Sequence, residues 1–279
     1  MSRRDEIIGK IAEVPALPAS SINAIALVQS KDVELTELTK FLEHEPGPAA
    51  NVLKLVNSAS YNLGQPVGTI KDAVIRLGRK QVMNIILSEL VGPVTKPAVR
   101  GYDLPPNDLW QHSIVVTIGA QIIAARQHSN SPDYYSVAGL LHDVGKIVLG
   151  TFVEVDAEPM IEIAKNERRP FNEVEEQVLG IDHAEAGAIL LENWKFPQEI
   201  INAVRWHHKP EESPYEATRY VHVADSISLM TGIGVGVEGL QYSPSEEAVK
   251  AVNLSVEETE KVTFNMLIGL QEAKRLFGM

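Results

Sequence analysis

The sequence predicts an all-α protein, and three observations lead to this fold class. Apolar residues recur at spacings of three and four along nearly every apolar segment, which is the period of an α-helix. Two polar residues followed three positions later by glutamate fit helix capping boxes, at Asn172 with Glu175 and at Ser255 with Glu258. No segment shows the alternation of apolar and polar residues that marks a half-buried strand.

Three segments carry the helical period most clearly: "SSINAIALVQS" (20–30), "PGPAANVLKLVNSA" (46–59) and the segment 256–277. In each of them the apolar residues fall near one face of the expected helix. In chain order these residues are Ile22, Ile25, Ala26 and Val28; Val52, Leu55 and Val56; and Val262, Met266, Leu270, Ala273 and Phe277.

Clusters of proline and glycine divide the chain. The segment "GPVTKPAVRGYDLPPND" (92–108) is the best candidate for a domain boundary. We expect an N-terminal helical lobe over residues 1–98 and a second helical lobe over 99–279 that includes a C-terminal helical extension. Residues 207–216 and the Gly-rich segment 231–245 are expected to be loops. Because the Gly-rich segment follows a helix rather than a strand, it is a poor candidate for a dinucleotide-binding loop.

The composition of the 279-residue chain excludes several classes of protein. It has no cysteine, so disulfides, iron–sulfur clusters and thiolate zinc sites are excluded, and any metal must be held by histidine and carboxylates. The formal net charge of −12 makes nucleic acid a poor partner. The N-terminus lacks the apolar core of a signal peptide, and the longest apolar stretch is about half a membrane span. We therefore expect a cytoplasmic protein with no membrane partner.

One basic cluster stands out, formed by Lys71, Arg76, Arg79 and Lys80. A solvated helix face is the simpler interpretation. A site for a small anion or a partner is the alternative.

Histidine is the residue type that points to chemistry. The stretch "LLHDVGKIVLG" (140–150) sets His142 beside Asp143 in apolar surroundings, with Lys146 one turn later. Further histidines follow the same pattern of nearby carboxylates or paired imidazoles. These are His112, four residues after Asp108; His183, one turn before Gly187; the pair His207 and His208; and His222, three residues before Asp225. His44 and His128 have polar neighbours and are expected at the surface.

Each histidine has a simple structural explanation, since a lone histidine in an apolar helix is more often hydrogen-bonded in the core than a ligand. We assign His222 to that class. Taken as a set, however, several buried imidazoles and two carboxylates cost several kcal/mol unless they pair or bind a cation. Imidazole and carboxylate without thiolate suit zinc, iron, manganese or nickel. Gly187 would allow another element to approach closely.

A carboxylate such as Asp143 can bridge two ions about 3.5–4 Å apart, the spacing of two-metal phosphoesterases. In such a site the bridging water ionises near neutral pH and becomes the nucleophile. Lys146 could then hold a phosphate oxygen.

At this point a resemblance becomes specific. The residues His112, His142, Asp143, His183, His207, His208 and Asp225 resemble the ligand set of the HD superfamily of metal-dependent phosphohydrolases. The segments "HDVGK" and "HAEAG" are similar to its HD-GYP branch, which hydrolyses cyclic di-GMP. The first half, with "VPALPAS", "HEPGPAANVLKLVNSASYN" and "TIKDAVIRLGRKQVMNIIL", resembles HDOD proteins, the HD-related output domains of bacterial signalling.

The resemblance implies two divalent metal ions in an HD-like helical bundle. His112, His142, Asp143 and Asp225 would hold one ion, and Asp143, His183, His207 and His208 would hold the other. Asp108 takes the place of a glutamate that joins a third metal in some HD-GYP proteins. If the site is catalytic, Asp143 and Lys146 would carry the reaction.

The resemblance also implies two alternative functions. HDOD proteins are typically regulatory modules, with output through protein partners in a signalling pathway. The complete ligand set instead favours a phosphohydrolase acting on a phosphodiester or nucleotide. After His207 and His208 this chain reads "KPEESPYEAT" where HD-GYP enzymes carry a "DGxGYP" loop that recognises the nucleotide. An open cleft at the metals would favour an enzyme, whereas a closed site would favour a structural role.

Overall fold

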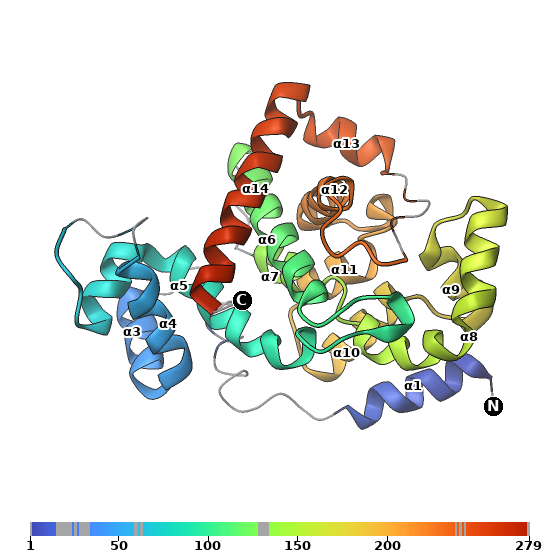
Figure 1. The fold of residues 1–279 in the computed structure, drawn as a ribbon, viewed down its shortest axis with the longest axis horizontal. Helices are drawn as coiled ribbons and strands as arrows, with labels where there is room; N and C mark the ends of the chain where they lie inside the picture. Colours follow the sequence, from blue (N-terminus) through green and yellow to red (C-terminus); the bar gives the residue numbers. More distant parts are fainter. Residues whose placement is uncertain are drawn as a thin grey trace. The chain divides into compact units, whose positions relative to one another are not determined.

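Figure 1 shows the computed structural model, which describes residues 2–14, 24, 27, 34–58, 61, 64–127, 134–237, 239, 242 and 244–277. Over these residues the chain forms helices, joined by loops with one isolated bridge between Val99 and Leu104. The predicted all-α fold class is confirmed. The helix predicted over residues 20–30 lies almost wholly outside the described residues.

The chain folds into two compact units that do not follow the order of the sequence. Unit 1 comprises residues 1–16 and 93–270, and unit 2 comprises residues 17–92 and 271–279. The proposed division into domains at residue 98 stays a prediction.

Unit 2 contains α3 (Leu35–His44), α4 (Pro46–Val56) and most of α5 (Ile70–Thr95). Val52, Leu55 and Val56 of α4 are all buried, which confirms the helix predicted in this segment. At Gly78 the φ angle is 74°, in the left-handed region that favours glycine, so α5 consists of two helices joined at a kink.

Unit 1 contains the remaining helices, from α1 near the N-terminus to α14 near the C-terminus (Figure 1). Helices α6, α7 and α12 pack on one another, and α11 packs on α7. The elements of unit 1 are α1 (Arg3–Glu13), η1 (Arg100–Tyr102), α6 (Asp108–Arg126), α7 (Tyr134–Leu141), α8 (Lys146–Glu167), α9 (Phe171–Leu179), α10 (His183–Asn193), α11 (Gln198–Arg205), η2 (Pro210–Glu212), α12 (Glu216–Met230), α13 (Glu246–Val252) and α14 (Val256–Phe277), whose last residues belong to unit 2.

The predicted helix over 256–277 is confirmed as α14, with Val262, Met266 and Leu270 buried and Ala273 and Phe277 half-buried. Its capping box is confirmed as well. The Glu258 backbone N–H donates to Ser255 Oγ at 3.3 Å, and the Ser255 N–H donates to Glu258 Oε2 at 2.8 Å.

The capping box predicted at Asn172 with Glu175 is wrong. Helix α9 starts one residue earlier, at Phe171, so Asn172 is already helical, and Pro170 occupies the cap position. Glu175 is fully buried and hydrogen-bonds elsewhere in unit 1. The pattern of polar residues matched a cap, but the apolar face of α9 determined where the helix begins and which way Glu175 points.

The stretch Tyr134–Glu167 is long and apolar enough, by length and composition, to cross a membrane. In the structure it forms two helices, α7 and α8, joined by the turn 142–145. Within its most apolar window, 89% of the residues are buried inside the protein, as in a core element.

Two glycines allow the turn 142–145 to touch α10. A Cβ atom added at Gly145 would lie 2.0 Å from the His183 carbonyl oxygen and 2.6 Å from the Gly187 nitrogen. A Cβ at Gly187 would lie 3.1 Å from the Gly145 nitrogen, so the close approach expected at Gly187 is confirmed. This backbone contact sets Asp143 beside His183.

We predict that Gly145→Ala lowers the free energy of unfolding by about 3 kcal/mol, because the methyl group overlaps backbone that cannot move aside. Gly145 has ordinary helical dihedral angles, so the effect comes from overlap alone. As a matched control, Gly9→Ala in α1 meets nothing within 4 Å. It should raise stability by about 0.5–1 kcal/mol. Urea unfolding measures both changes, and a Gly145→Ala protein as stable as wild type would contradict the contact.

Candidate functional site

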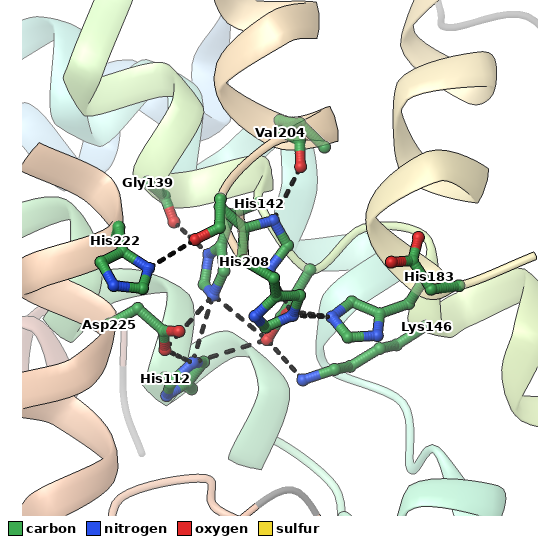
Figure 2. Close-up of polar contacts among 12 residues, drawn as sticks. His112, Gly139, His142, Lys146, His183, Val204, His208, His222 and Asp225 are labelled. Atoms are coloured by element: carbon green, nitrogen blue, oxygen red, sulfur yellow. Dashed lines mark hydrogen bonds and ion pairs between the residues drawn. The ribbon is translucent and has the colours of Figure 1, made fainter. Parts of the chain in front are cut away.

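The histidines and carboxylates predicted as ligands meet at one place in unit 1 (Figure 2). Apart from the half-buried His208, each of these residues is at most 2% exposed. Most come from helix ends or the turns that follow them: His112 in α6, His142 and Asp143 after α7, Lys146 at the start of α8, His183 at the start of α10, His207 and His208 after α11, and Asp225 within α12.

Backbone carbonyls determine which nitrogen of three of these histidines carries the proton. His142 Nδ1 lies 2.9 Å from the Gly139 oxygen, and His207 Nδ1 lies 2.7 Å from the Val204 oxygen. His112 Nδ1 lies 3.1 Å from the Ile233 oxygen. Since a carbonyl oxygen can accept but not donate, each Nδ1 must donate its proton. The Nε2 atom of each neutral ring is then left with a lone pair.

These lone pairs converge. His142 Nε2 lies 3.2 Å from His112 Nε2. His208 Nε2 lies 2.8 Å from His183 Nε2, within hydrogen-bond distance for a proton carried by one of the two rings. His207 Nε2 is buried and has no hydrogen-bond partner in the described part of the chain. Imidazole nitrogens that face one another without a shared proton repel, and a buried acceptor without a donor is costly. A cation among them would remove both penalties.

Asp143 divides the cluster into two groups of donor atoms. Its Oδ2 atom lies 3.2 Å from His142 Nε2 and 3.5 Å from His112 Nε2. Its Oδ1 atom lies 3.4 Å from His183 Nε2 and 3.9 Å from His207 Nε2. One carboxylate therefore presents an oxygen to each of two sets of imidazoles.

Asp225 belongs to the first group, since its Oδ1 atom is 3.0 Å from His112 Nε2 and 3.8 Å from His142 Nε2. Lys146 also contacts the Asp143 carboxylate, with Nζ 2.7 Å from Oδ2. In both His112–His142–Asp225 and His183–His207–His208, the donor atoms lie within 4.8 Å of one another.

The electrostatics favour ionised carboxylates, which protons on the neighbouring His142 and His112 stabilise where no metal ion takes their place. Burial alone would raise the pKa of Asp143, but the charges of His142, Lys146 and His112 hold it well below its ordinary value. Burial likewise opposes ionisation of Asp225, yet its hydrogen bond and charge interaction with His112 lower the pKa of Asp225.

Burial and the neighbouring histidines lower the pKa of His207 and His208 well below that of a free imidazole. For His142, burial lowers the pKa, but the charges of Asp143 and Asp225 more than compensate and raise it. Ionised carboxylates and neutral imidazoles are the states that metal binding requires.

The donor set fits divalent metal ions. It consists of imidazole nitrogens and carboxylate oxygens, which suit zinc, iron, manganese or nickel. An ion on each side of Asp143 would account for the orphaned His207 Nε2 and for the facing Nε2 atoms of His112 and His142. The geometry thus accommodates the two predicted ligand groups.

The other candidates lie outside these groups. Asp108 is the first residue of α6, and none of the potential ligand groups among the described residues includes it. His222 has both ring nitrogens occupied: Nδ1 donates to the His207 oxygen at 2.6 Å, and Nε2 accepts from the Ser245 N–H at 2.8 Å. His44 is exposed on α3, and His128 lies outside the described residues.

The basic cluster lies apart from these ligands in sequence and belongs to the other unit. All four residues belong to α5 in unit 2, where Lys71 and Arg76 are exposed and Arg79 is half-buried.

Sequence reasoning missed Glu175. Its Oε2 atom accepts hydrogen bonds from His183 Nδ1 and from the His183 backbone N–H, both at 2.8 Å. A signal was present in the sequence, because Glu175 lies four residues after Phe171 and four before Leu179, on the apolar face of α9. A glutamate on a buried face needs a partner, whereas a cap would be solvated.

The Gly-rich loop after α12 has a structural role at the site. Gly234 has a φ of 61°, and a Cβ atom there would lie 2.6 Å from His112 Cβ. This close approach places the Ile233 carbonyl against His112 Nδ1. Gly234 therefore allows the loop backbone to pack against His112.

Comparisons with known proteins agree with this fold. The HDOD domain model matches residues 14–210. A curated but uncharacterized protein of Treponema pallidum (strain Nichols) is 26% identical over 212 residues, which are 75% of this chain and 40% of that protein. The chain thus spans less than half the length of this relative.

Solved structures share the fold. An HDOD domain protein of unknown function from Geobacter sulfurreducens has a TM-score of 0.70 at 24% identity, with 99% of this chain and 94% of that chain covered. A provisionally named phosphohydrolase from Shewanella amazonensis SB2B has a TM-score of 0.70 at 25% identity, with 97% of each chain covered. A provisionally named signal transduction protein from Marinobacter aquaeolei VT8 has a TM-score of 0.74 at 22% identity, covering 100% of this chain and 62% of that one.

We predict that protein purified without an affinity tag and without oxygen carries about two equivalents of divalent metal per chain. Asp143→Asn should lose most of this metal and lower the melting temperature, since both ion positions lose a charged ligand and Lys146 loses its partner. His44→Gln, a change at an exposed histidine in unit 2, should alter neither quantity. Elemental analysis and calorimetry measure both. Unchanged metal content in Asp143→Asn would show that His142 and Asp143 are core residues.

Proposed function

Because the chain belongs to the HDOD domain family, we propose that it is a regulatory module of bacterial signalling whose output is contact with another protein. In this proposal two divalent metal ions stabilise unit 1 by joining α6, α12 and the turns after α7 and α11. Metal binding contributes directly to folding stability when the ligands converge only in the native state. We place the module in the cytoplasm.

The observation that carries this function is the closure of the centre. Six of the seven proposed ligands are at most 2% exposed, and His208 is half-buried. The loop after α12 packs over His112, and Lys146 already pairs with Asp143 Oδ2. Structural metal sites are closed, whereas catalytic sites keep an open position for water or substrate.

A surface for the output lies between α12 and α14. A groove of about 560 Å³ there is predominantly apolar, with Met230 72% exposed and Phe264 63% exposed. Monomeric proteins seldom expose a contiguous apolar surface of this kind without a partner. The apolar lining consists of Ile227, Met230, Leu254, Val256, Phe264 and Leu267.

Helix α14 is apolar on two faces. Met266 and Leu270 are buried within unit 1, whereas Phe264 and Leu267 on another face remain exposed. A helix with apolar residues on two sides is normally covered on both. The second face of α14 is therefore suited to another helix.

The charge of the groove indicates the polarity of that helix. Glu260 lines the groove, is exposed, and has no ion-pair partner in the described part of the chain. Its acidic neighbours are already paired, Glu257 with Lys261 and Glu258 with Arg126. We therefore assign the groove to an amphipathic helix of a protein partner with a lysine or arginine beside its apolar face.

A metal-dependent phosphohydrolase acting on a phosphodiester, such as a cyclic nucleotide, is the second candidate. It is favoured by the position of Asp143 between two ligand groups, as in two-metal hydrolases. Bound metal would supply a nucleophile by lowering the pKa of a coordinated water. Lys146 would then leave Asp143 and neutralise charge on a phosphoryl oxygen.

A hydrolysis assay separates the two functions. We predict that metal-loaded wild-type protein hydrolyses bis(p-nitrophenyl) phosphate and cyclic di-GMP no faster than Asp143→Asn does. This expectation follows from the burial of six of the seven proposed ligands. Hydrolysis by the wild type that disappears in Asp143→Asn would overturn the regulatory function and establish the second candidate.

A binding experiment tests the groove. Two synthetic helical peptides share one leucine face, and their polar faces are lysine in one and glutamate in the other. We predict that the lysine peptide binds more tightly than the glutamate peptide. Phe264→Asp should weaken the affinity for the lysine peptide by about tenfold or more. Glu260→Lys should reverse the preference between peptides.

Val155→Asp is the matched control, since Val155 is 74% exposed on α8, outside the groove. It should leave both affinities unchanged in fluorescence titrations. Equal binding of both peptides to the wild type, with no effect of Phe264→Asp, would remove the groove as the output surface.

A further inference from the structure

The cluster histidines are not oriented in the same way. His112, His142 and His207 each donate their Nδ1 proton to a backbone carbonyl, which is neutral. His183 Nδ1 instead faces the carboxylate of Glu175, at 2.8 Å. A carboxylate on the far nitrogen fixes the imidazole ring and makes its other nitrogen a stronger donor to metal. The two ion positions therefore differ in the basicity of their ligands.

Glu175 is itself held in place by three hydrogen bonds. Oε2 accepts the two bonds from His183, and Oε1 accepts a 2.6 Å bond from the Tyr102 hydroxyl. Glu175 is fully buried and Tyr102 is 1% exposed. Both carboxylate oxygens thus have donors, and rotation of the fully buried carboxylate would break these bonds.

Tyr102 meets the site at a second point. Lys146 Nζ lies 5.5 Å from the centre of the Tyr102 ring, while the same ammonium pairs with Asp143 at 2.7 Å. The ring also packs edge-on against His183, with 6.1 Å between centroids. One side chain of η1 therefore contacts both Lys146 and the carboxylate behind His183.

We propose that Glu175 and Tyr102 are positioning residues that set the affinity of the ion held by His183, and leave the ion between His112 and His142 largely unaffected. This inference rests on the metal centre of the proposed function. Glu175 orients His183 directly, and Tyr102 acts through Glu175. Neither residue is a proposed ligand, and both were absent from the ligand set predicted from the sequence.

The test is a titration of metal-free protein with Zn²⁺ against a chromophoric chelator, repeated with Co²⁺ to follow the absorption of the bound ion. Glu175→Gln should weaken the affinity for one of the two ions by about 10–100-fold and leave the affinity for the other within about twofold of wild type. Tyr102→Phe should weaken the same ion by about fivefold, the effect of losing one hydrogen bond to a buried carboxylate. Both variants should change the Co²⁺ absorption of that ion.

Two controls isolate positioning from general loss of stability. Tyr220→Phe removes a tyrosine hydroxyl that bonds to Glu216 at 3.1 Å, outside the ligand cluster, and should leave both affinities unchanged. Val262→Ala creates a cavity in the core contact of α14 and should lower the melting temperature without changing either affinity.

The outcomes are distinct. If the wild type binds two ions and Glu175→Gln weakens both affinities equally, or changes neither, the positioning role is overturned and the metal centre stays in place. A wild-type protein that takes up no ion would instead overturn the proposed centre, and the positioning role with it.

Discussion

The buried carboxylate of Asp143 is the constraint on which the arrangement of unit 1 depends. At 2% exposure it has lost its water, and an ionised group in that state is tolerated only when surrounded by opposite charge and donors. Lys146 satisfies one oxygen. The Nε2 atoms of imidazoles from α6, α10 and the turns after α7 and α11 face both oxygens at 3.2–3.9 Å, and a cation between them would supply the remaining positive charge. The contact between Gly145 and Gly187 brings two of these elements close enough to do so.

Helix ends supply the means of orienting the ligands. The last carbonyls of a helix have no partner within it, and they are available to side chains that follow. His142 follows α7 and bonds to Gly139, while His207 follows α11 and bonds to Val204. Each of these short helices is thus followed by a histidine whose Nδ1 proton is bonded to a carbonyl of that helix. The same bonds direct the Nε2 atoms toward Asp143.

In the proposed function, the closed centre and the exposed groove have separate tasks in unit 1. The buried ligands would contribute stability and a defined backbone, whereas the apolar groove with Glu260, which has no ion-pair partner among the described residues, would receive a partner. Both features are consistent with membership of a family of output domains. They share α12, which carries Asp225 at the centre and Met230 at the groove.

The sequence by itself determined the helical fold class and drew attention to the side chains that meet around Asp143. Apolar periodicity and the chemistry of histidine and aspartate are properties of short segments, so they can be recognised without the fold. Tertiary structure decided which oxygen of Asp143 faces which imidazoles, and that His222 is hydrogen-bonded outside the ligand groups. It also placed Glu175 behind His183 instead of at a helix cap, through a contact with Tyr102 across 73 residues of chain. Such pairings depend on how distant elements pack, and no local pattern specifies them.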